Sequence, residues 1–303
     1  KTLWEAGVPK SAFAFLPCKK VTLDPFLKSK DTFDAVILTG GTDTAKFLLK
    51  RTPRLKLYAE TGGKNATIIT ALGDREQGIK NVIQSAFGNA GQKCSATSLL
   101  ILEKEIYEDV RFKKLLKDAA KSKGYGSPWD LQTEIGPISV KINKKLQYVL
   151  DHTLEEQWLL KPIKLGDFLL SPGIKWGVTS KDYEYRNELF GPILSVMKVG
   201  DLKEAVALVN GLEYGLTSGI ESLDSEEVTY WLENIKAGNL YVNRSTTGAV
   251  VERQPFGGIK ASCFGFGMKA GGLNYILQFL DLSEPILTKK EIKKNYMEVY
   301  QTH

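Results

Sequence analysis

Two side chains with complementary reactivity stand 34 positions apart (94 minus 60) in this sequence. Glu60 begins the run ETGGKN, and Cys94 lies beside Lys93 in the run GQKCS. A cysteine thiolate can add to a carbonyl carbon, and a carboxylate can then activate the water that hydrolyses the thioester. The residue types leave a second interpretation open, in which Glu60 lies on the surface and Cys94 in the core, where most free cysteines lie.

The spacing of apolar residues predicts the elements around this pair. Residues 55–59 alternate like a strand that leads into Glu60, and residues 98–102 form another apolar run after Cys94. Between them, apolar residues recur at steps of three and four, which predicts a helix with one apolar face. These residues are Ile79, Val82, Ile83, Ala86 and Phe87. A strand end and a helix end would therefore position the two reactive side chains.

A glycine turn precedes this region. Residues 11–16 and 35–38 are short apolar runs, which we interpret as buried parallel strands. Gly40 and Gly41 follow the second run, and a predicted helix continues through residues 46–50. Unpaired N–H groups at a helix N-terminus favour a phosphate group, although an ordinary strand–helix turn has the same pattern.

Composition excludes several classes of function. The 303 residues, 43% of them hydrophobic, can bury a sizeable core, and there is neither an apolar run of membrane-spanning length nor a signal peptide. Three cysteines without paired spacing favour a reducing compartment, so we expect a cytoplasmic protein. Two histidines nearly exclude a Ser-His-Asp or histidine-rich zinc mechanism, and we expect no metal site.

The charge pattern indicates no nucleic-acid contact. The net charge is +6, but basic and acidic residues are interspersed through most of the chain. The one clear basic run lies at residues 289–294, and we interpret it as a solvated helix end.

Further helices are predicted at residues 108–121, 202–210 and 225–235, together with one that ends at His152. We expect His152 to cap or pack there rather than to catalyse.

The motifs around Glu60 and Cys94, with their spacing, resemble the aldehyde dehydrogenase superfamily. Thr61 and Ser95 within these motifs resemble more narrowly the Δ1-pyrroline-5-carboxylate (L-glutamate gamma-semialdehyde) dehydrogenases, above all the dehydrogenase domain of bifunctional proline utilization A proteins. The resemblance extends almost to Leu282. The residues before Lys1 that a complete family member has are not in this sequence, so we expect an N-terminally truncated chain.

The resemblance implies an α/β fold with three parts. Residues 1–62 would be the C-terminal part of a Rossmann-type NAD-binding domain, and residues 63–257 the α/β catalytic domain. Residues 258–303 would form a C-terminal segment that closes the active site and takes part in oligomerisation. A homo-oligomer is implied for a complete family member.

The resemblance also assigns roles to residues. Cys94 would be the nucleophile, and Glu60 the base that activates the hydrolytic water. A Cys94 pKa one or two units below about 8.5 would make much of it a thiolate at neutral pH. The cofactor-binding residues would be Gly40, Gly41, Thr42, Asp43, Thr44, Glu188 and Phe190. The substrate-binding residues would be Ser95, Gly248 and Ala249, which hold a carboxylate, and Phe256, which packs on the aliphatic chain.

Two of these assignments have physical support. A carboxylate such as Glu188 can accept hydrogen bonds from two ribose hydroxyl groups, and an aromatic ring such as Phe190 can pack on a nicotinamide face. The alternative is an exposed acid followed by a core phenylalanine. Small residues at Gly248 and Ala249 let backbone N–H groups approach and hold a carboxylate, although a plain glycine loop has the same composition.

The function implied is NAD-dependent oxidation of L-glutamate 5-semialdehyde, the opened form of Δ1-pyrroline-5-carboxylate, to L-glutamate in proline catabolism. Cys94 would carry the thiohemiacetal and thioester. NADP stays open as the cofactor, and FAD is expected only if a proline dehydrogenase domain precedes the chain or associates with it. Two alternatives remain: another semialdehyde dehydrogenase of the same fold, or an inactive fragment or assembly module that lacks half of its cofactor site.

Overall fold

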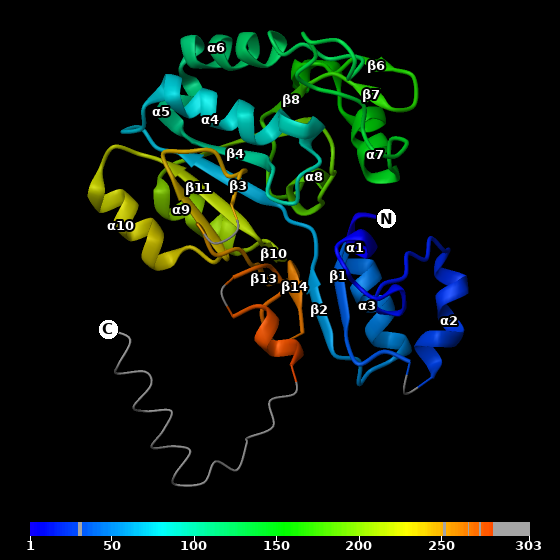
Figure 1. Ribbon diagram of the computed structural model, residues 1–303. Helices are drawn as coiled ribbons and strands as arrows, with labels where there is room; N and C mark the ends of the chain where they lie inside the picture. The colour runs from blue at the N-terminus through cyan, green and yellow to red at the C-terminus, as the bar shows by residue number, and fades with distance from the viewer. Residues whose placement is uncertain (30–31, 251–252, 266, 273, 281–303) are drawn as a thin grey trace, which may run out of the picture.

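The structure is a computed structural model, and it describes residues 1–29, 32–250, 253–265, 267–272 and 274–280 (Figure 1). The described residues form two α/β units of unequal size, joined where β2 leads into β3. No helix among them is long and apolar enough to cross a membrane. The basic run at residues 289–294 lies outside the described residues.

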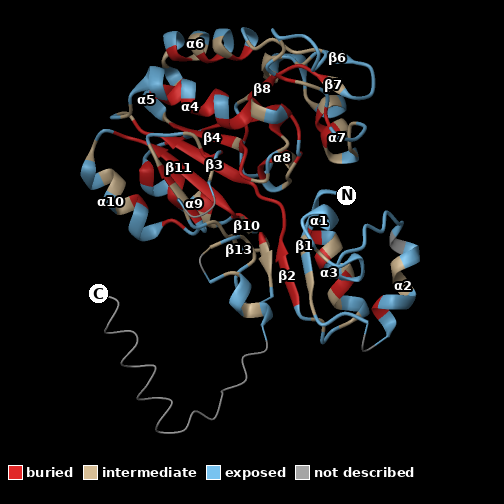
Figure 2. Ribbon diagram, in the orientation of Figure 1, coloured by how far each residue is buried: buried red, intermediate tan, exposed pale blue. Residues whose placement is uncertain are grey.

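The larger unit is built on a seven-stranded sheet in the order β12-β11-β3-β4-β9-β8-β5. All neighbouring strands are parallel except β5 and β8. The strands are β3 (Asn65–Ile69), β4 (Thr97–Glu103), β5 (Trp158–Leu160), β8 (Gly173–Trp176), β9 (Ile193–Val199), β11 (Thr217–Glu221) and β12 (Asn239–Val242). The sheet is red across its centre in Figure 2, since helices cover both faces.

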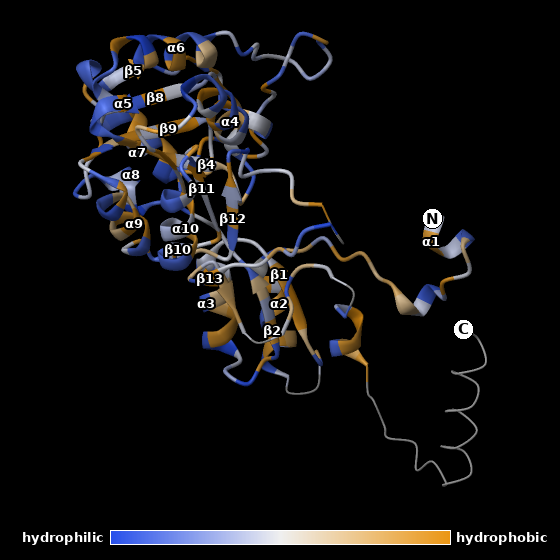
Figure 3. Ribbon diagram, turned by 90° about the vertical axis from the view of Figure 1, so that its left-hand side faces the viewer, coloured by the Kyte–Doolittle hydropathy of each residue, from blue (hydrophilic) through white to orange (hydrophobic). Residues whose placement is uncertain are grey.

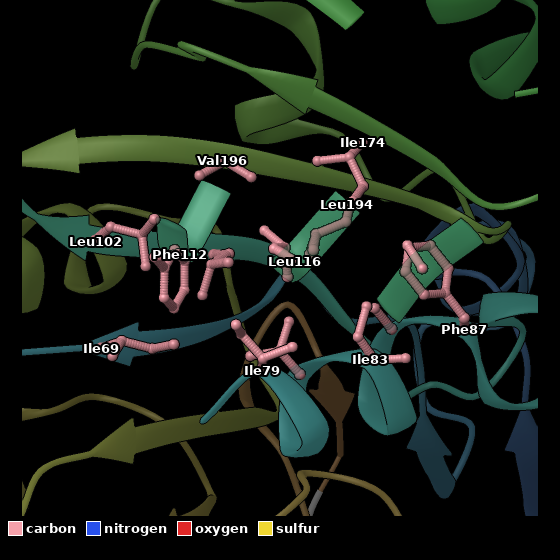
Figure 4. Packing of buried hydrophobic residues seen from close by; sticks show 14 of the residues in the cluster. Ile69, Ile79, Ile83, Phe87, Leu102, Phe112, Leu116, Ile174, Leu194 and Val196 are labelled. Carbon is pink, nitrogen blue, oxygen red and sulfur yellow. The ribbon is translucent and has the colours of Figure 1, made fainter. Parts of the chain in front are cut away.

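Alternate residues of the central strands pack into two different clusters. Leu100 and Leu102 of β4 face the cluster under α4 (Arg75–Phe87) and α6 (Val110–Lys121), which Figure 4 shows. Leu99 and Ile101 face the cluster under α9 (Leu202–Asn210) and α10 (Ser225–Asn234). This alternation follows from the two-residue repeat of a strand, and it explains why β4 is apolar throughout.

Aspartate caps set several helix starts. Asp74 accepts hydrogen bonds from Glu76 N and Gln77 N, both at 3.0 Å, at the start of α4. Asp109 ends α5 (Lys104–Glu108) and caps α6, so the predicted helix over residues 108–121 in fact begins at Val110. An unpaired N–H group at each helix start explains the preference for such side chains. The helices predicted at residues 202–210 and 225–235 are α9 and α10.

The smaller unit contains a three-stranded sheet in the order β1-β2-β14. Strand β1 (Val36–Thr39) is parallel to β2 (Leu57–Glu60), and β14 (Cys263–Phe264) is antiparallel to β2. Helices α2 (Lys20–Lys28) and α3 (Thr42–Arg51) accompany this sheet. The residues after position 257 therefore return to the first part of the chain, and Cys263 lies opposite Glu60.

The strand predicted at residues 11–16 is wrong. The segment begins with a short 3-10 helix, η1 (Lys10–Ala12), and Phe15 is 83% exposed. Among the described strands, β1 pairs only with β2, so no strand lies beside this segment to bury it. The strand predicted at residues 35–38 is confirmed as β1, but its side chains are not all buried, because it forms the edge of the sheet.

The remaining elements are short and surround the sheets. They are α1 (Thr2–Glu5), η2 (Gly88–Gly91), α7 (Lys144–His152), η3 (Glu155–Gln157), β6 (Lys164–Leu165), β7 (Leu169–Leu170), α8 (Tyr183–Arg186), β10 (Tyr214–Gly215), β13 (Ile259–Lys260) and η4 (Ile276–Phe279). His152 ends α7, where its ring stacks on Tyr148 with ring centroids 4.1 Å apart. That contact agrees with a packing role.

Candidate active site

Glu60 and Cys94 line the same cavity. Glu60 ends β2, and Cys94 lies in the loop between η2 and β4, so the amino ends of the larger sheet's strands meet the smaller sheet here. The cavity has a volume of about 420 Å³. Its lining consists of Thr39, Gly40, Gly41, Glu60, Thr61, Gly62, Cys94, Glu188 and Phe190. The structure thus brings both reactive side chains together with four of the predicted cofactor-binding residues.

A second cavity, of about 550 Å³, is also lined by Cys94. All four predicted substrate-binding residues line it: Ser95, Gly248, Ala249 and Phe256. Phe190 and Cys94 belong to the linings of both cavities. Cys94 therefore stands between one cavity edged by glycines and carboxylates and another edged by small residues and an aromatic ring.

Glu60 has the surroundings of a general base. Its Oε1 accepts a hydrogen bond from Gly258 N at 3.3 Å, whereas its Oε2 is buried without a hydrogen-bond partner among the described residues. Burial raises the pKa of Glu60, and the Gly258 N–H group and Lys269 partly oppose that rise. A carboxylate with a raised pKa and one unpaired oxygen is suited to take a proton from a water molecule.

The structure contradicts the low pKa expected for Cys94. Its pKa is raised, which disfavours the thiolate. Burial raises it most, the Glu188 and Glu60 carboxylates raise it further, and the backbone N–H groups of Ser95 and Cys94 partly compensate. Lys93 is exposed and is not among the groups that shift this pKa. Burial of the thiol and, after it, the two nearby carboxylates explain the difference, because both disfavour a thiolate.

Asn65 holds the backbone of the cysteine loop. Its Nδ2 donates to Cys94 O at 2.7 Å and to Ala96 O at 2.9 Å, and its Oδ1 accepts from Thr217 N at 3.0 Å. The side chain is almost fully buried, so these bonds are shielded from water. Our sequence reasoning missed this residue, although it closes the same run, ETGGKN, that Glu60 begins.

The two glycines of that run are required by close contacts. A Cβ atom at Gly62 would lie 2.0 Å from Glu188 Oε2. A Cβ atom at Gly63 would lie 2.6 Å from Asn65 Oδ1 and 2.8 Å from Cys94 O. Any larger residue would displace either the cysteine loop or Glu188.

Glu188 is anchored beside these glycines. Its Oε1 accepts from Gly63 N at 3.0 Å. Burial raises its pKa, and the Gly63 N–H group, Lys145 and Lys64 lower it in part. Lys64, also missed by our sequence reasoning, is buried and donates to Ser98 Oγ at 3.0 Å, and burial lowers its pKa to about 8. A buried cation near a buried carboxylate favours the ionised form of Glu188.

Phe190 has a strained backbone, with φ of +52°. Its carbonyl oxygen accepts from Gln92 Nε2 at 3.2 Å, and Gln92 Oε1 accepts from Ser139 N at 2.8 Å. A left-handed conformation is unfavourable for a residue with a side chain and persists where surrounding contacts hold it. Gln92 therefore links the cysteine loop to the loop that carries Phe190.

The turn between β1 and α3 fits a phosphate group. Gly41 precedes the ten-residue helix α3, so no side chain caps the start of this helix. Both Gly40 and Gly41 line the first cavity. Helix-start N–H groups and the helix dipole attract an anion there. Thr42, Asp43 and Thr44 form the first turn of α3 but are not in the cavity lining. No group of three or more His, Cys, Asp or Glu side chains in the described ranges could hold a metal ion.

Comparison with known proteins identifies relatives. The aldehyde dehydrogenase family model matches residues 1–283. A 1-pyrroline-5-carboxylate dehydrogenase of Staphylococcus aureus is 33% identical over 296 residues, which cover 92% of this chain and 56% of the relative. The chain therefore spans about half the length of the curated relatives it matches.

Solved structures of related proteins are also similar to this chain. Proline utilization A from Corynebacterium freiburgense is 39% identical with a TM-score of 0.85, over 94% of this chain and 30% of that one. The Thermus 1-pyrroline-5-carboxylate dehydrogenase with bound NAD is 31% identical with a TM-score of 0.79, over 91% of this chain and 55% of that one.

Proposed function

The chain belongs to the aldehyde dehydrogenase family, and we propose that it oxidises L-glutamate 5-semialdehyde, derived from Δ1-pyrroline-5-carboxylate, to L-glutamate with NAD. One observation carries this proposal. Cys94 lies between a cavity with Glu60 and Glu188 and a cavity with Ser95, Gly248 and Ala249. The residues that we propose as base, ribose ligand and carboxylate site therefore all line cavities that also contain Cys94, the proposed nucleophile.

In the proposed reaction, the Cys94 thiol loses its proton to solvent water, and the thiolate Sγ adds to the aldehyde carbon. The Cys94 backbone N–H group would stabilise the oxyanion that forms. NAD, when bound, would accept the hydride that leaves the thiohemiacetal carbon. The carbon is then a thioester, and Glu60 takes a proton from the water that adds to it, so that L-glutamate leaves and the sulfur is free again.

The cofactor would occupy the first cavity. The turn at residues 40–44, at the start of α3, would hold the pyrophosphate, Glu188 the ribose hydroxyl groups and Phe190 the nicotinamide face. NAD has support from a relative, since the Thermus structure was solved with it bound. The choice of NAD over NADP is part of our proposal.

The substrate carboxylate would lie in the second cavity, on Ser95 and the backbone of Gly248 and Ala249, with Phe256 against the aliphatic chain. Gly248 has φ of +98°, and a Cβ atom there would have no neighbour within 4 Å. Glycine is therefore required at this position for its backbone conformation rather than for lack of space. That conformation is typical of loops that turn N–H groups toward an anion.

The domain boundaries, a linked domain and the cellular compartment are also proposals. We keep the boundaries 1–62, 63–257 and 258–303, and the pairing of β14 with β2 supports a last segment that closes over Glu60. The chain spans only 30% of the Corynebacterium relative, which leaves room for a linked proline dehydrogenase domain. Three free cysteines among the described residues suit a reducing compartment such as the cytoplasm.

The substrate can be tested by comparing kcat/KM for Δ1-pyrroline-5-carboxylate and for succinate semialdehyde with NAD. We would assay both this chain and a fusion in which the preceding part comes from the Thermus relative. We expect the fusion to prefer the pyrroline-derived substrate, and the chain alone to turn over weakly or not at all. A fusion that prefers succinate semialdehyde would contradict the substrate.

The role of Glu60 gives a separate prediction. In the same fusion, Glu60→Gln should retain a pre-steady-state burst of NADH, while steady turnover falls by about 10² or more because water activation is lost. Stopped-flow absorbance at the NADH band measures both phases. Loss of the burst together with turnover would instead place Glu60 at activation of Cys94.

A further inference from the structure

A chain of buried hydroxyl groups ends on the backbone carbonyl of Ser95. Thr246 Oγ1 donates to Ser95 O at 2.9 Å. Thr97 Oγ1 lies 3.0 Å from Thr246 Oγ1, and Thr67 Oγ1 lies 2.8 Å from Thr97 Oγ1. A hydroxyl group has one hydrogen to donate, and Thr246 uses its hydrogen on Ser95. Thr97 must therefore donate to Thr246, and Thr67 to Thr97, so all three hydrogen bonds run toward Ser95.

The network has no access to solvent. Thr67, Thr97 and Thr246 are each at most 2% exposed. Inside a protein such a chain of hydrogen bonds is stronger than in water. Ser95 O also accepts from Thr217 Oγ1 at 3.3 Å, so removal of the Thr246 hydroxyl leaves Ser95 O with only this longer hydrogen bond and Thr97 Oγ1 without its acceptor. The hydroxyl groups therefore hold Ser95 firmly.

Thr246 is also fixed from a second side. Its N–H group donates to Ser85 Oγ at 3.0 Å, and Ser85 Oγ donates to Asn81 O at 2.6 Å within α4. Two residues later the chain reaches Gly248 and Ala249, which line the same cavity as Ser95. Thr246 is thus the point where the cysteine loop and the 248–249 loop are joined by a side chain.

We propose that Thr246 is a positioning residue that sets the separation between Ser95 and the 248–249 backbone, and that it thereby makes the site selective for aldehydes with a carboxylate group. This inference rests on the proposed function, which places the substrate carboxylate between these two segments. Donors on two separate loops converge on one carboxylate only when the loops keep a fixed distance.

The side chain of Thr246 also packs, so the test must separate packing from hydrogen bonding. A Cβ atom at Gly219 would lie 3.1 Å from Thr246 Cγ2, which shows how closely this methyl group approaches β11. Thr246→Val keeps that shape and loses the hydroxyl group. Thr246→Ser keeps the hydroxyl group and loses the methyl group, so the two variants form a matched pair.

The experiment measures how well small ligands protect Cys94 from iodoacetamide in the 303-residue chain. The probes are L-glutamate and its 1-amide, which lacks the α-carboxylate. The parent chain should prefer L-glutamate. In Thr246→Val the half-protecting concentration of L-glutamate should rise about 3- to 10-fold, while that of the 1-amide stays unchanged. Thr246→Ser should stay within about twofold of the parent for both probes.

The outcomes separate this inference from the proposed function. If neither the parent nor the variants prefer L-glutamate over the 1-amide, the proposed substrate is wrong and the inference falls with it. If the parent prefers L-glutamate and Thr246→Val keeps the same preference, only the inference is overturned. Should Thr246→Val fail to fold by circular dichroism, Thr97→Val tests the same network one step further from Ser95. A preference equal to the parent's in that variant also overturns the inference.

Discussion

Cys94 combines a nucleophile's position with an unfavourable local charge. Burial and the Glu188 and Glu60 carboxylates raise its pKa, in that order. In the chain without ligands, the thiol should therefore stay protonated at neutral pH more than an ordinary cysteine does. The proposed binding of cationic nicotinamide beside Glu188 would offset part of this charge.

Alkylation measures this directly. The rate of Cys94 with iodoacetamide should rise with a pH midpoint above that of an ordinary cysteine thiol, because its pKa is raised. Glu188→Gln should lower that midpoint because one negative charge is removed. Peptide mapping assigns the label to Cys94 rather than to Cys18 or Cys263. Glu233→Gln, an exposed residue of α10, is the control. A midpoint below that of an ordinary thiol in the parent chain would contradict the assignment of charges.

Glu221 lies at the opposite end of the sheet from Cys94, and its titration should make the free energy of unfolding depend on pH. The side chain is buried, and Asn81 Nδ2 donates to both of its oxygens, at 3.0 and 3.1 Å. Burial raises its pKa to about 7, while Asn81 partly opposes the rise. The folded chain thus binds this proton more tightly than the unfolded chain, in which glutamate titrates at its ordinary value.

The free energy of unfolding should therefore fall as pH rises from about 4.5 to about 7, and the contribution should be constant above that range. A shift of this size corresponds to about 3 kcal/mol. Glu221→Gln should remove the fall and be the more stable form at pH 8. Urea unfolding at pH 5, 6, 7 and 8 measures this, with Glu233→Gln as the reference. Parallel pH profiles for Glu221→Gln and the parent would rule the linkage out.

At the scale of elements, β14 joins the last part of the chain to β2. Gly265 follows β14 with φ of +78°, and a Cβ atom there would lie 1.6 Å from Leu57 O of β2. Gly166, between β6 and β7, has nearly the same φ of +73° but no atom within 4 Å of its Cβ position. The two glycines have the same left-handed backbone conformation, which would strain any residue with a side chain, and they differ in the close contact at Gly265.

Gly166→Ala should cost about 1–2 kcal/mol, the usual cost of a left-handed backbone with a side chain. Gly265→Ala should in addition detach β14, because a backbone carbonyl cannot move aside as a side chain can. Cys263, half-buried in β14, would then react with iodoacetamide at least about tenfold faster. The reason is that lowering the free energy of local opening of β14 by about 1.4 kcal/mol raises the opening equilibrium constant tenfold. Equal Cys263 rates in the two variants would show that β14 tolerates the contact.

At the scale of the whole molecule, the two units differ in how completely they are covered. The larger sheet has helices on both faces, whereas β1 is an open edge on which Ile37 is 54% exposed. Figure 3 shows the N-terminal segment leading away from both units, and its Phe13, Phe15 and Leu16 are exposed. Unpaired backbone groups and exposed apolar side chains favour association with another surface.

The isolated chain should therefore self-associate at micromolar concentration. Ile37→Lys should reduce the association, because a charged side chain on an edge strand opposes pairing with a second chain. Gln84→Lys, at an exposed position of α4 in the larger unit, adds the same charge without removing an apolar side chain, so it should have no effect and serves as the control. Sedimentation velocity between about 5 and 100 µM covers the concentrations at which such edges associate. A monomer throughout that range would contradict the prediction.

The sequence by itself determined the features that neighbouring residues encode. Apolar spacing predicted α9 at its observed bounds and α10 within one residue, because a helix buries one face and its residues recur at a fixed step. The short motifs around Glu60 and Cys94 indicated the family, since each groups several unusual residue types within a few positions. Those signals need no knowledge of how the elements pack.

Only the tertiary structure decided how distant segments meet. Asn65 holds Cys94 O across 29 positions, and Thr246 holds Ser95 O across 151. The apolar residues 11–16 looked like a strand, but their burial depended on a neighbouring strand that the described residues do not supply. The pKa of Cys94 likewise depends on Glu188, which is remote in sequence and close in space. Local patterns specify which face of an element is apolar, whereas electrostatic and hydrogen-bonding partners depend on which elements are packed side by side.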